Sequence, residues 1–138
     1  MRDHSRESEF WDSLMLAHTP GLGLMGCKIL LDHYGSAERA VRDPSEWASL
    51  GVAERNVADN FRQEKWRDKA QNEWEAARRG NMAVVTYSDP SYPDRLRHIA
   101  DPPQYLYYRG DIKTLHAPCL AIVGSRTCTG IGKHVTQN

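Results

Sequence analysis

The chain has 138 residues, of which 40% are hydrophobic and 26% are charged. This is the composition of an ordinary globular protein, and the length allows one domain, or one small domain and part of another. Lysine and arginine together number 18, as do aspartate and glutamate, so no global field draws the chain to nucleic acid or to an anionic membrane. Any such contact has to be local.

The sequence carries no signal for a membrane, a metal or a bound cofactor. No apolar run approaches the roughly 18 residues of a membrane-spanning helix, and the first residues lack the core of a signal peptide, so we expect a cytoplasmic protein. The cysteines Cys27, Cys119 and Cys128 are odd in number and form no C-x-x-C pair, which favours reduced thiols. Cys119 stands in an apolar run and is expected in the core. No histidine pair has helical metal-ligand spacing together with an acid. The six histidines are therefore assigned to the surface or to loops; they are His4, His18, His33, His98, His116 and His134.

Two amphipathic helices open the chain. Phe10 and Leu14 recur at helical spacing within residues 7–18, and the pattern resumes over residues 24–34. Gly35 then stands where a left-handed helix cap is expected. The first eighty residues therefore begin as helix, tight turn, helix.

The helical pattern continues to residue 80. Ser36 is expected to cap a short helix over residues 37–41, and Asp43, with a proline directly after it, to begin a fourth. Residues 52–79 predict one or two further helices, with a break near Gln63.

After residue 80 the spacing of the apolar residues changes from helical to strand-like. Residues 82–87 and 104–109 are short, rich in β-branched and aromatic residues, and bounded by turn residues, so both predict strands. Residues 92–99 predict a short helix between them. A third apolar strand is expected at 120–123, and a helix starts in residues 129–138.

These patterns predict a fold of the α+β or α/β class. Residues 1–80 form an all-helical domain, and residues 81–138 begin an α/β domain. The boundary is placed at the shift in composition near Gly80.

The turn between the first two helices resembles the helix-hairpin-helix of many DNA-binding proteins. Gly21 and Gly23 let the backbone approach a phosphate and turn its N–H groups outward, and Lys28 adds positive charge. The alternative is a turn that merely joins two packed helices. The two interpretations have about equal weight, and the neighbouring Asp32 favours the structural one slightly.

A glycine- and hydroxyl-rich loop follows the apolar run at 120–123. Gly124 permits close backbone approach, Ser125 and Thr129 supply hydroxyl groups, Arg126 can grip a phosphate with two parallel hydrogen bonds, and Gly132 completes the loop. A strand, such a loop and a helix start in this order favour phosphate binding over a plain turn with a solvated arginine. The spacing matches neither a Walker loop nor a dinucleotide fingerprint.

The tryptophans stand on predicted helices at core-like spacing. Base stacking is the alternative role for such side chains in single-strand binders. We expect packing for most of them, with Trp66 the least settled; the four are Trp11, Trp47, Trp66 and Trp74.

The stretch from Tyr92 to Gly132 resembles the DNA-processing protein A (DprA/Smf) family. The matching residues are Tyr92, Pro93, Leu96, Ile99, Asp101, Pro102, Pro103, Leu106, Tyr107, Gly110, Ala121, Ile122, Val123, Gly124, Ser125, Arg126, Thr129 and Gly132. The helices before them resemble that family's N-terminal domain of the sterile-alpha-motif (SAM-like) or helix-hairpin-helix type.

The resemblance implies a DNA-binding protein, not an enzyme, that takes single-stranded DNA as its partner. Such a protein protects DNA entering during natural transformation (competence) and helps load the recombinase RecA for recombination. The resemblance assigns Gly124, Ser125 and Arg126, with Thr129 and Gly132, to a DNA-phosphate pocket. It also implies a homodimer for the full-length family.

The resemblance further implies that the chain stops early in the Rossmann-like domain. The regions for dimerisation and RecA contact would then lie beyond Asn138, and the strand at 120–123 would have an unpaired apolar edge. We therefore expect a C-terminal third that is partly disordered or prone to aggregate. Two other functions stay open: a nucleotide-binding or nucleotide-processing Rossmann-like enzyme, and a helical protein-interaction module.

Overall fold

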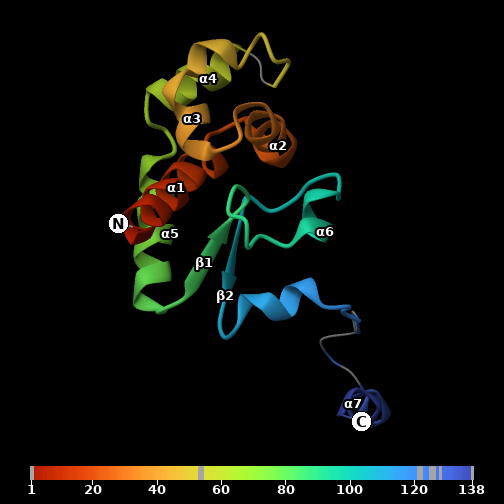
Figure 1. Cartoon of the computed structure of the whole chain (residues 1–138). Coiled ribbons are helices and arrows are strands. Elements are labelled where there is room, and N and C mark those ends of the chain that lie inside the picture. The colour runs from red at the N-terminus through yellow and green to blue at the C-terminus, as the bar shows by residue number, and fades with distance from the viewer. Residues whose placement is uncertain (1, 53–54, 121–122, 125–126, 128, 138) are drawn as a thin grey trace.

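The computed structural model describes residues 2–52, 55–120, 123–124, 127 and 129–137. Helices fill the first part of the chain, and a small sheet follows them (Figure 1). The helical elements before the sheet are α1 (Arg2–Ala17), α2 (Gly23–Tyr34), α3 (Ala37–Arg42), the 3-10 turn η1 (Pro44–Glu46), α4 (Arg55–Arg62) and α5 (Arg67–Arg79). After them come β1 (Ala83–Thr86), α6 (Asp94–Arg97), β2 (Tyr105–Tyr108), η2 (Ile112–His116) and α7 (Gly130–Gln137).

Helix α1 lies at the centre of the packed part of the molecule. It contacts α2, α3, α5 and β1. Its residues Phe10, Leu14 and Leu16 are buried, and they belong to the same core cluster as Val85 of β1 and Tyr92. The helices and the sheet therefore share one hydrophobic core, whose burial supplies the main favourable term in folding.

The predicted helix signals at the end of α2 and the start of α3 are confirmed. Gly35 has a φ of 79°, and its N–H donates to the carbonyl of Leu31 at 2.8 Å. Glycine takes this left-handed conformation without steric cost. The Ser36 hydroxyl oxygen accepts from the N–H of Arg39 at 3.3 Å, as an N-cap does.

The predicted break near Gln63 is confirmed, because α4 ends at Arg62 and α5 begins at Arg67. Trp66 stands at this corner and is 3% exposed, and its indole N–H donates to the carbonyl of Phe61 at 3.0 Å. The prediction of packing is thus confirmed for Trp66, and also for Trp47, which is fully buried.

The two predicted strands are also confirmed, as an antiparallel pair. The register aligns Ala83 with Tyr108 and Thr86 with Tyr105. The sheet packs on α1 through Phe10, whose ring meets those of Tyr105 and Tyr107 edge-on at 5.3 and 5.9 Å between centroids. Such edge-to-face pairs are favourable beyond the area that they bury.

Two expectations for residues 119–123 are wrong as far as the structure describes them. Leu120 and Val123 have no regular structure and are 97% and 91% exposed, whereas a buried strand was predicted; Ala121 and Ile122 lie outside the described residues. Cys119 is exposed instead of being in the core. The physical reason is that a strand is buried only where a neighbouring strand and covering helices receive it. The described sheet is antiparallel and two-stranded, and it supplies neither.

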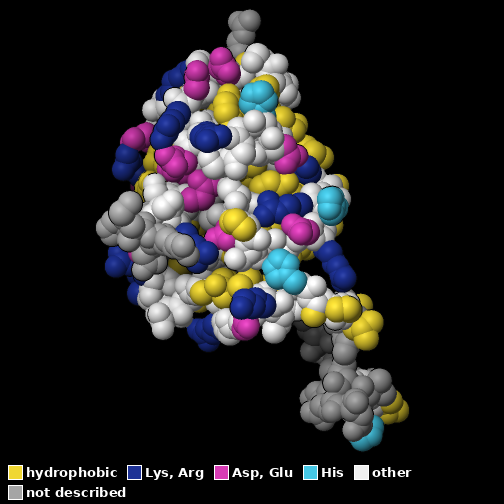
Figure 2. All heavy atoms as spheres, in the orientation of Figure 1, with side chains coloured by type: hydrophobic (Ala, Val, Ile, Leu, Met, Phe, Trp, Pro, Cys, Tyr) yellow, Lys and Arg dark blue, Asp and Glu magenta, His cyan; other side chains and the backbone are white. Residues whose placement is uncertain are grey.

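The surface mixes charges of both signs. Figure 2 shows Lys and Arg side chains spread among Asp and Glu side chains on the face in view, in keeping with the equal totals of the sequence. None of the helices in the described ranges is both long and apolar enough to cross a membrane.

Candidate nucleic-acid interface

The predicted phosphate loop leads into a helix, as expected. Gly124 and Thr129 are exposed, and α7 begins directly after Thr129. Thr129 Oγ1 accepts a hydrogen bond from the N–H of Gly132 at 3.3 Å, so the threonine caps the first turn. Ser125 and Arg126 lie outside the described residues.

This local geometry suits an anion at the start of α7. The first N–H groups of a helix lack partners within the helix, and the helix dipole favours negative charge there. A Cβ atom built on Gly124 would have no other atom within 4 Å, so the backbone is open at that point. Figure 1 shows α7 apart from the packed helices and sheet.

The predicted hairpin turn is present, and part of it is explained by packing. Gly21 and Gly23 have φ values of 90° and 64°. A Cβ atom on Gly21 would come within 2.9 Å of Val57 Cγ2, and Asn60 Nδ2 donates to the carbonyl of Pro20 at 3.1 Å. Gly21 is therefore required where α4 packs against the turn. Gly23 has open space at the same position.

Lys28 is paired within its own helix. Its ammonium group lies 2.5 Å from Asp32 Oδ2, and Asp32 Oδ1 accepts a second hydrogen bond from the hydroxyl of Tyr87 at 2.7 Å. Partial burial raises the pKa of Asp32, but the bonds from Lys28 and Tyr87 outweigh it and hold the pKa below its usual value. Asp32 thus offsets the charge that Lys28 would offer a phosphate, and DNA contact at the hairpin stays a prediction.

A polar cluster around Glu73 was missed by sequence reasoning. Glu73 Oε2 lies 2.6 Å from His18 Nε2, and Glu73 Oε1 accepts from the hydroxyls of Tyr105 and Tyr107 at 2.9 and 2.8 Å. His18, assigned to the surface or a loop from the sequence, stands in the turn after α1, and its side chain is 23% exposed. The one signal available was the i, i+2 spacing of the two tyrosines, which places them on one face of a strand.

Burial shifts the pKa values of this cluster in a consistent way. It raises the pKa of Glu73, but the hydrogen bonds from Tyr107, His18 and Tyr105 together lower it below the usual value. Burial and the nearby carboxylate both raise the pKa of Tyr105 and of Tyr107. The carboxylate is therefore kept charged and the phenols neutral, so the cluster joins the turn after α1 to α5 and β2.

The described residues hold no group of three or more His, Cys, Asp or Glu side chains placed to bind a metal ion. The two described cysteines are free thiols. Cys27 is buried, and burial raises the pKa of its thiol to about 12. A buried thiol that stays protonated packs against its neighbours and is a poor nucleophile.

A helical region, a small sheet, and a glycine-containing loop that opens into a helix define a mixed α and β protein with a candidate anion site at a helix N-terminus. Residues 83–138 match the family described as DNA recombination-mediator protein A, and the resemblance predicted from the sequence is confirmed over these residues. The match supports a DNA-processing role in recombination. No curated protein matched the chain. No solved structure matched it either.

Proposed function

We propose that this chain is a single-stranded-DNA-binding accessory protein of natural transformation and recombination, acting by holding DNA without covalent chemistry. The observation that carries the proposal is the family match over residues 83–138, which includes the whole glycine-containing loop. The open backbone at Gly124 and the helix that begins after Thr129 support it, because the N-terminus of a helix favours a bound anion.

The proposed site holds a DNA phosphate between the loop and the first turn of α7. Gly124 gives close approach, and Arg126 supplies a planar guanidinium suited to a phosphate. The Ser125 hydroxyl adds a further donor, and Thr129 and Gly132 complete the loop at the start of α7. Contacts of this kind hold the DNA strand in position but do not distinguish its bases.

The wider roles follow from the same family. They are protection of incoming DNA, help in loading RecA, action in the cytoplasm, and a homodimer for the full-length family. We also propose that residues 1–80 form the family's SAM-like or helix-hairpin-helix domain and that residues 81–138 belong to its Rossmann-like domain. The match to residues 83–138 begins at β1, close to this boundary.

Binding to DNA is tested by fluorescence anisotropy of a labelled oligo-dT over a salt series, with Arg126→Ala beside the unchanged chain. We expect affinity to fall steeply with salt, and to fall about tenfold or more on loss of a phosphate-binding arginine. The slope of log K against log salt should lessen by about one.

Arg39→Ala is the matched control. Arg39 is an exposed arginine on α3, so its loss removes the same charge away from the loop. Equal effects of the two substitutions, or no binding at low salt, would contradict the proposal.

A further inference from the structure

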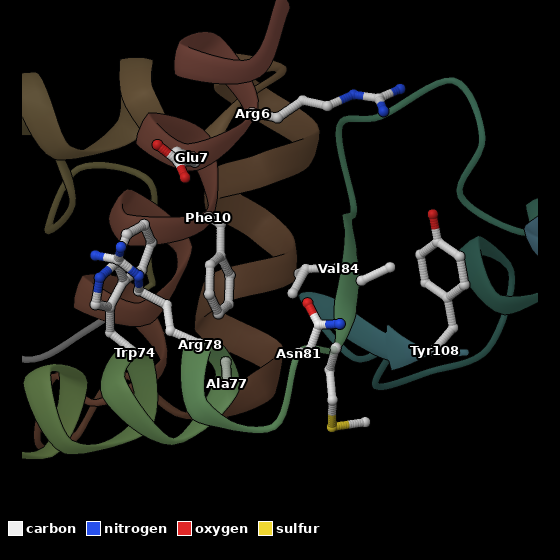
Figure 3. Close-up of a pocket in the computed structure, with 11 residues that line it drawn as sticks. Arg6, Glu7, Phe10, Trp74, Ala77, Arg78, Asn81, Val84 and Tyr108 are labelled. Atoms are coloured by element: carbon white, nitrogen blue, oxygen red, sulfur yellow. The ribbon is translucent and has the colours of Figure 1, made fainter. Parts of the chain in front are cut away.

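A polar cavity with a volume of about 360 Å³ lies where α1, the start of α3 and the end of β1 meet. The hydroxyl-bearing residues Ser5, Ser36 and Ser88 are among those that line it. Figure 3 shows a second hollow between α1, α5 and β1, and Arg6 lines both. A cavity of this size can hold a small ligand.

Thr86 brings a buried hydroxyl group to this cavity. It is the last residue of β1 and is 7% exposed. Side chains alternate along a strand, so Thr86 shares the face of Val84, which Figure 3 shows on the side of Phe10 and α1. Thr86 lines the cavity, and its hydroxyl makes no hydrogen bond to the described residues. Polar side chains buried to this degree are nearly always paired, so the hydroxyl is available to a ligand.

Glu9 supplies a carboxylate from α1. Its Oε1 accepts from the N–H of Ala37 at 2.8 Å and its Oε2 from the N–H of Glu38 at 3.0 Å, so it also holds the start of α3. The hydroxyl of Ser88 donates to Oε1 as well. All of these donors are uncharged, and the structure gives Glu9 no ion pair with a described residue. The negative charge of Glu9 therefore has no matching cation in the described part of the chain.

The other charges that line the cavity are matched in pairs. Arg6 lies 3.2 Å from Asp89, whose side chain is 10% exposed, and Figure 3 shows Arg6 extending from α1 past the end of β1. Glu38 is paired with Arg42, and both side chains are exposed. Among the lining charges the carboxylate of Glu9 is therefore left over, and the cavity has a net negative charge.

Asp12, about one turn after Glu9 on α1, responds to this excess of negative charge. Burial raises the pKa of Asp12, and repulsion from Glu9 and Glu38 raises it further, to about 6. The attraction of Arg42 only partly opposes these effects. A cation in the cavity would relieve the repulsion.

The groups in the cavity favour an ammonium ligand over a metal ion or a guanidinium. The described side chains include no cluster of three or more His, Cys, Asp or Glu that could hold a metal. A guanidinium is best held by a carboxylate with both oxygens free, and both oxygens of Glu9 already accept hydrogen bonds. An ammonium group is compact and has three donors, which suit single acceptors such as the Thr86 hydroxyl and one Glu9 oxygen.

We propose that this cavity binds a primary ammonium group, which donates hydrogen bonds to Thr86 Oγ1 and to the Glu9 carboxylate. The ligand is an alkylamine, either a free polyamine or the lysine side chain of a partner protein. The site is separate from the loop before α7, and it does not depend on the proposed binding of DNA.

The first experiment is an NMR titration of the full ¹⁵N-labelled chain with putrescine. The amide signals of Thr86, Ser88 and Glu38 should shift and saturate at millimolar concentrations. Tetramethylammonium is also a cation but has no N–H donor, so it should not saturate these signals. Saturation by tetramethylammonium at the same concentrations, or by magnesium chloride at lower ones, would overturn the assignment to an ammonium group. No saturable shift with putrescine would overturn the site.

Two substitutions of Thr86 test the hydroxyl group. Thr86→Val keeps the shape of the side chain and should weaken putrescine binding at least about fivefold, because a hydrogen bond to a charged group is lost. Thr86→Ser keeps a hydroxyl and should bind within about twofold of the unchanged chain. Neither change removes a hydrogen bond from the described fold, so both variants should fold. Equal affinities of the two variants would overturn the proposal.

Glu9→Gln tests the charge and should weaken putrescine binding about tenfold or more. Glu75→Gln removes the same charge from α5, outside the lining of the cavity, and should stay within about twofold of the unchanged chain. Circular dichroism checks that the helices are kept, because Glu9 also holds α3. Equal effects of the two substitutions would contradict the site, and the Thr86 pair decides if Glu9→Gln does not fold.

A lysine analogue distinguishes the two sources of the ammonium group. Nα-acetyl-lysine amide carries one ammonium group on the side chain that a partner protein would present. Putrescine binding at least about tenfold tighter than this analogue would support a free polyamine as the ligand. Equal or tighter binding of the analogue would support the lysine of a partner protein.

Discussion

The described residues within 5–112 and those within 117–137 differ in whether their apolar side chains are buried. In the first region Leu14, Trp47 and Tyr92 are fully excluded from water within one core. In the second, the apolar side chains of Leu120 and Ile131 are 97% and 78% exposed. The stability of the described structure therefore resides in the first region, while the proposed phosphate loop lies in the second. Substitutions in the two regions should separate folding from binding.

The sharpest test of this contrast is Trp47→Ala. Trp47 is fully buried, it packs on Phe61 at 4.9 Å between centroids, and its indole N–H donates to the carbonyl of Ala40 at 3.0 Å. We expect a loss of about 3–5 kcal/mol in the free energy of unfolding, measured by urea denaturation followed at 222 nm.

Leu120→Ala is the counterpart in the second region. It should change the free energy of unfolding by less than about 0.5 kcal/mol, because its side chain is already in water. A loss comparable to that of Trp47→Ala would mean that the second region also contributes a packed core, and the contrast would fail.

The two glycines of the hairpin give the next largest effect. Gly21→Ala should cost about 2–3 kcal/mol, since alanine would meet both a left-handed φ and the Val57 side chain at 2.9 Å. Gly23→Ala faces only the backbone strain and should cost about 1 kcal/mol. Thermal or urea unfolding of the pair measures the difference.

The same pair tests DNA contact at the hairpin. Weaker oligo-dT binding by a folded Gly23→Ala variant would support a hairpin contact. Unchanged binding would leave the turn with its packing role alone.

Glu73→Gln tests the polar tie between the helices and the sheet. Two tyrosine hydroxyls and His18 lose a charged acceptor, so we expect a loss of about 1–2 kcal/mol at pH 7. Because the pKa of Glu73 is lowered by folding, its stabilisation is present above the unfolded value of 4.5 and is lost as the pH falls through the lower folded value.

The difference between the unchanged chain and Glu73→Gln should therefore shrink below about pH 4.5. Glu75→Gln, on the exposed side of the same helix, should have an effect under about 0.5 kcal/mol at every pH. A difference in the free energy of unfolding between the unchanged chain and Glu73→Gln that stays constant from pH 7 to pH 3 would contradict the role of the charge.

Asp12→Asn should give a small effect of the opposite sign. Burial, with repulsion from Glu9 and Glu38, raises the pKa of Asp12 from 3.8 to about 6. The charged form is thus disfavoured in the folded state, and asparagine should stabilise the chain by about 1 kcal/mol at pH 7, a value discounted for partial exposure to solvent.

As the pH falls, protonation of Asp12 should stabilise the folded chain, whereas protonation of Glu73 should destabilise it. The advantage of asparagine should fade as the pH drops from about 6 to 3.8, because Asp12 becomes protonated in the folded state first. Urea unfolding at both ends of this range measures it, and a destabilised Asp12→Asn variant at pH 7 would contradict the inferred cost.

Local signals in the sequence predicted most elements of the packed region. Gly35, Ser36 and the period-two stretches around β1 and β2 act through the backbone of a few neighbouring residues, so their outcome is readable from the chain. The failure at Leu120 and Val123 has the converse cause. An apolar run indicates that burial would be favourable, but the run is buried only where a neighbouring strand and covering helices pack against it.

The sequence by itself determined the helical start of the chain, the switch to strands after residue 80, and the loop that opens into α7, because caps, periodicity and turn residues are local. It also carried the family resemblance, confirmed over residues 83–138. Only the tertiary structure decided that Glu73 meets His18 and two tyrosines, and that Gly21 lies against Val57. Such contacts depend on how elements that are far apart in the sequence pack together, and local spacing along the chain does not reveal that packing.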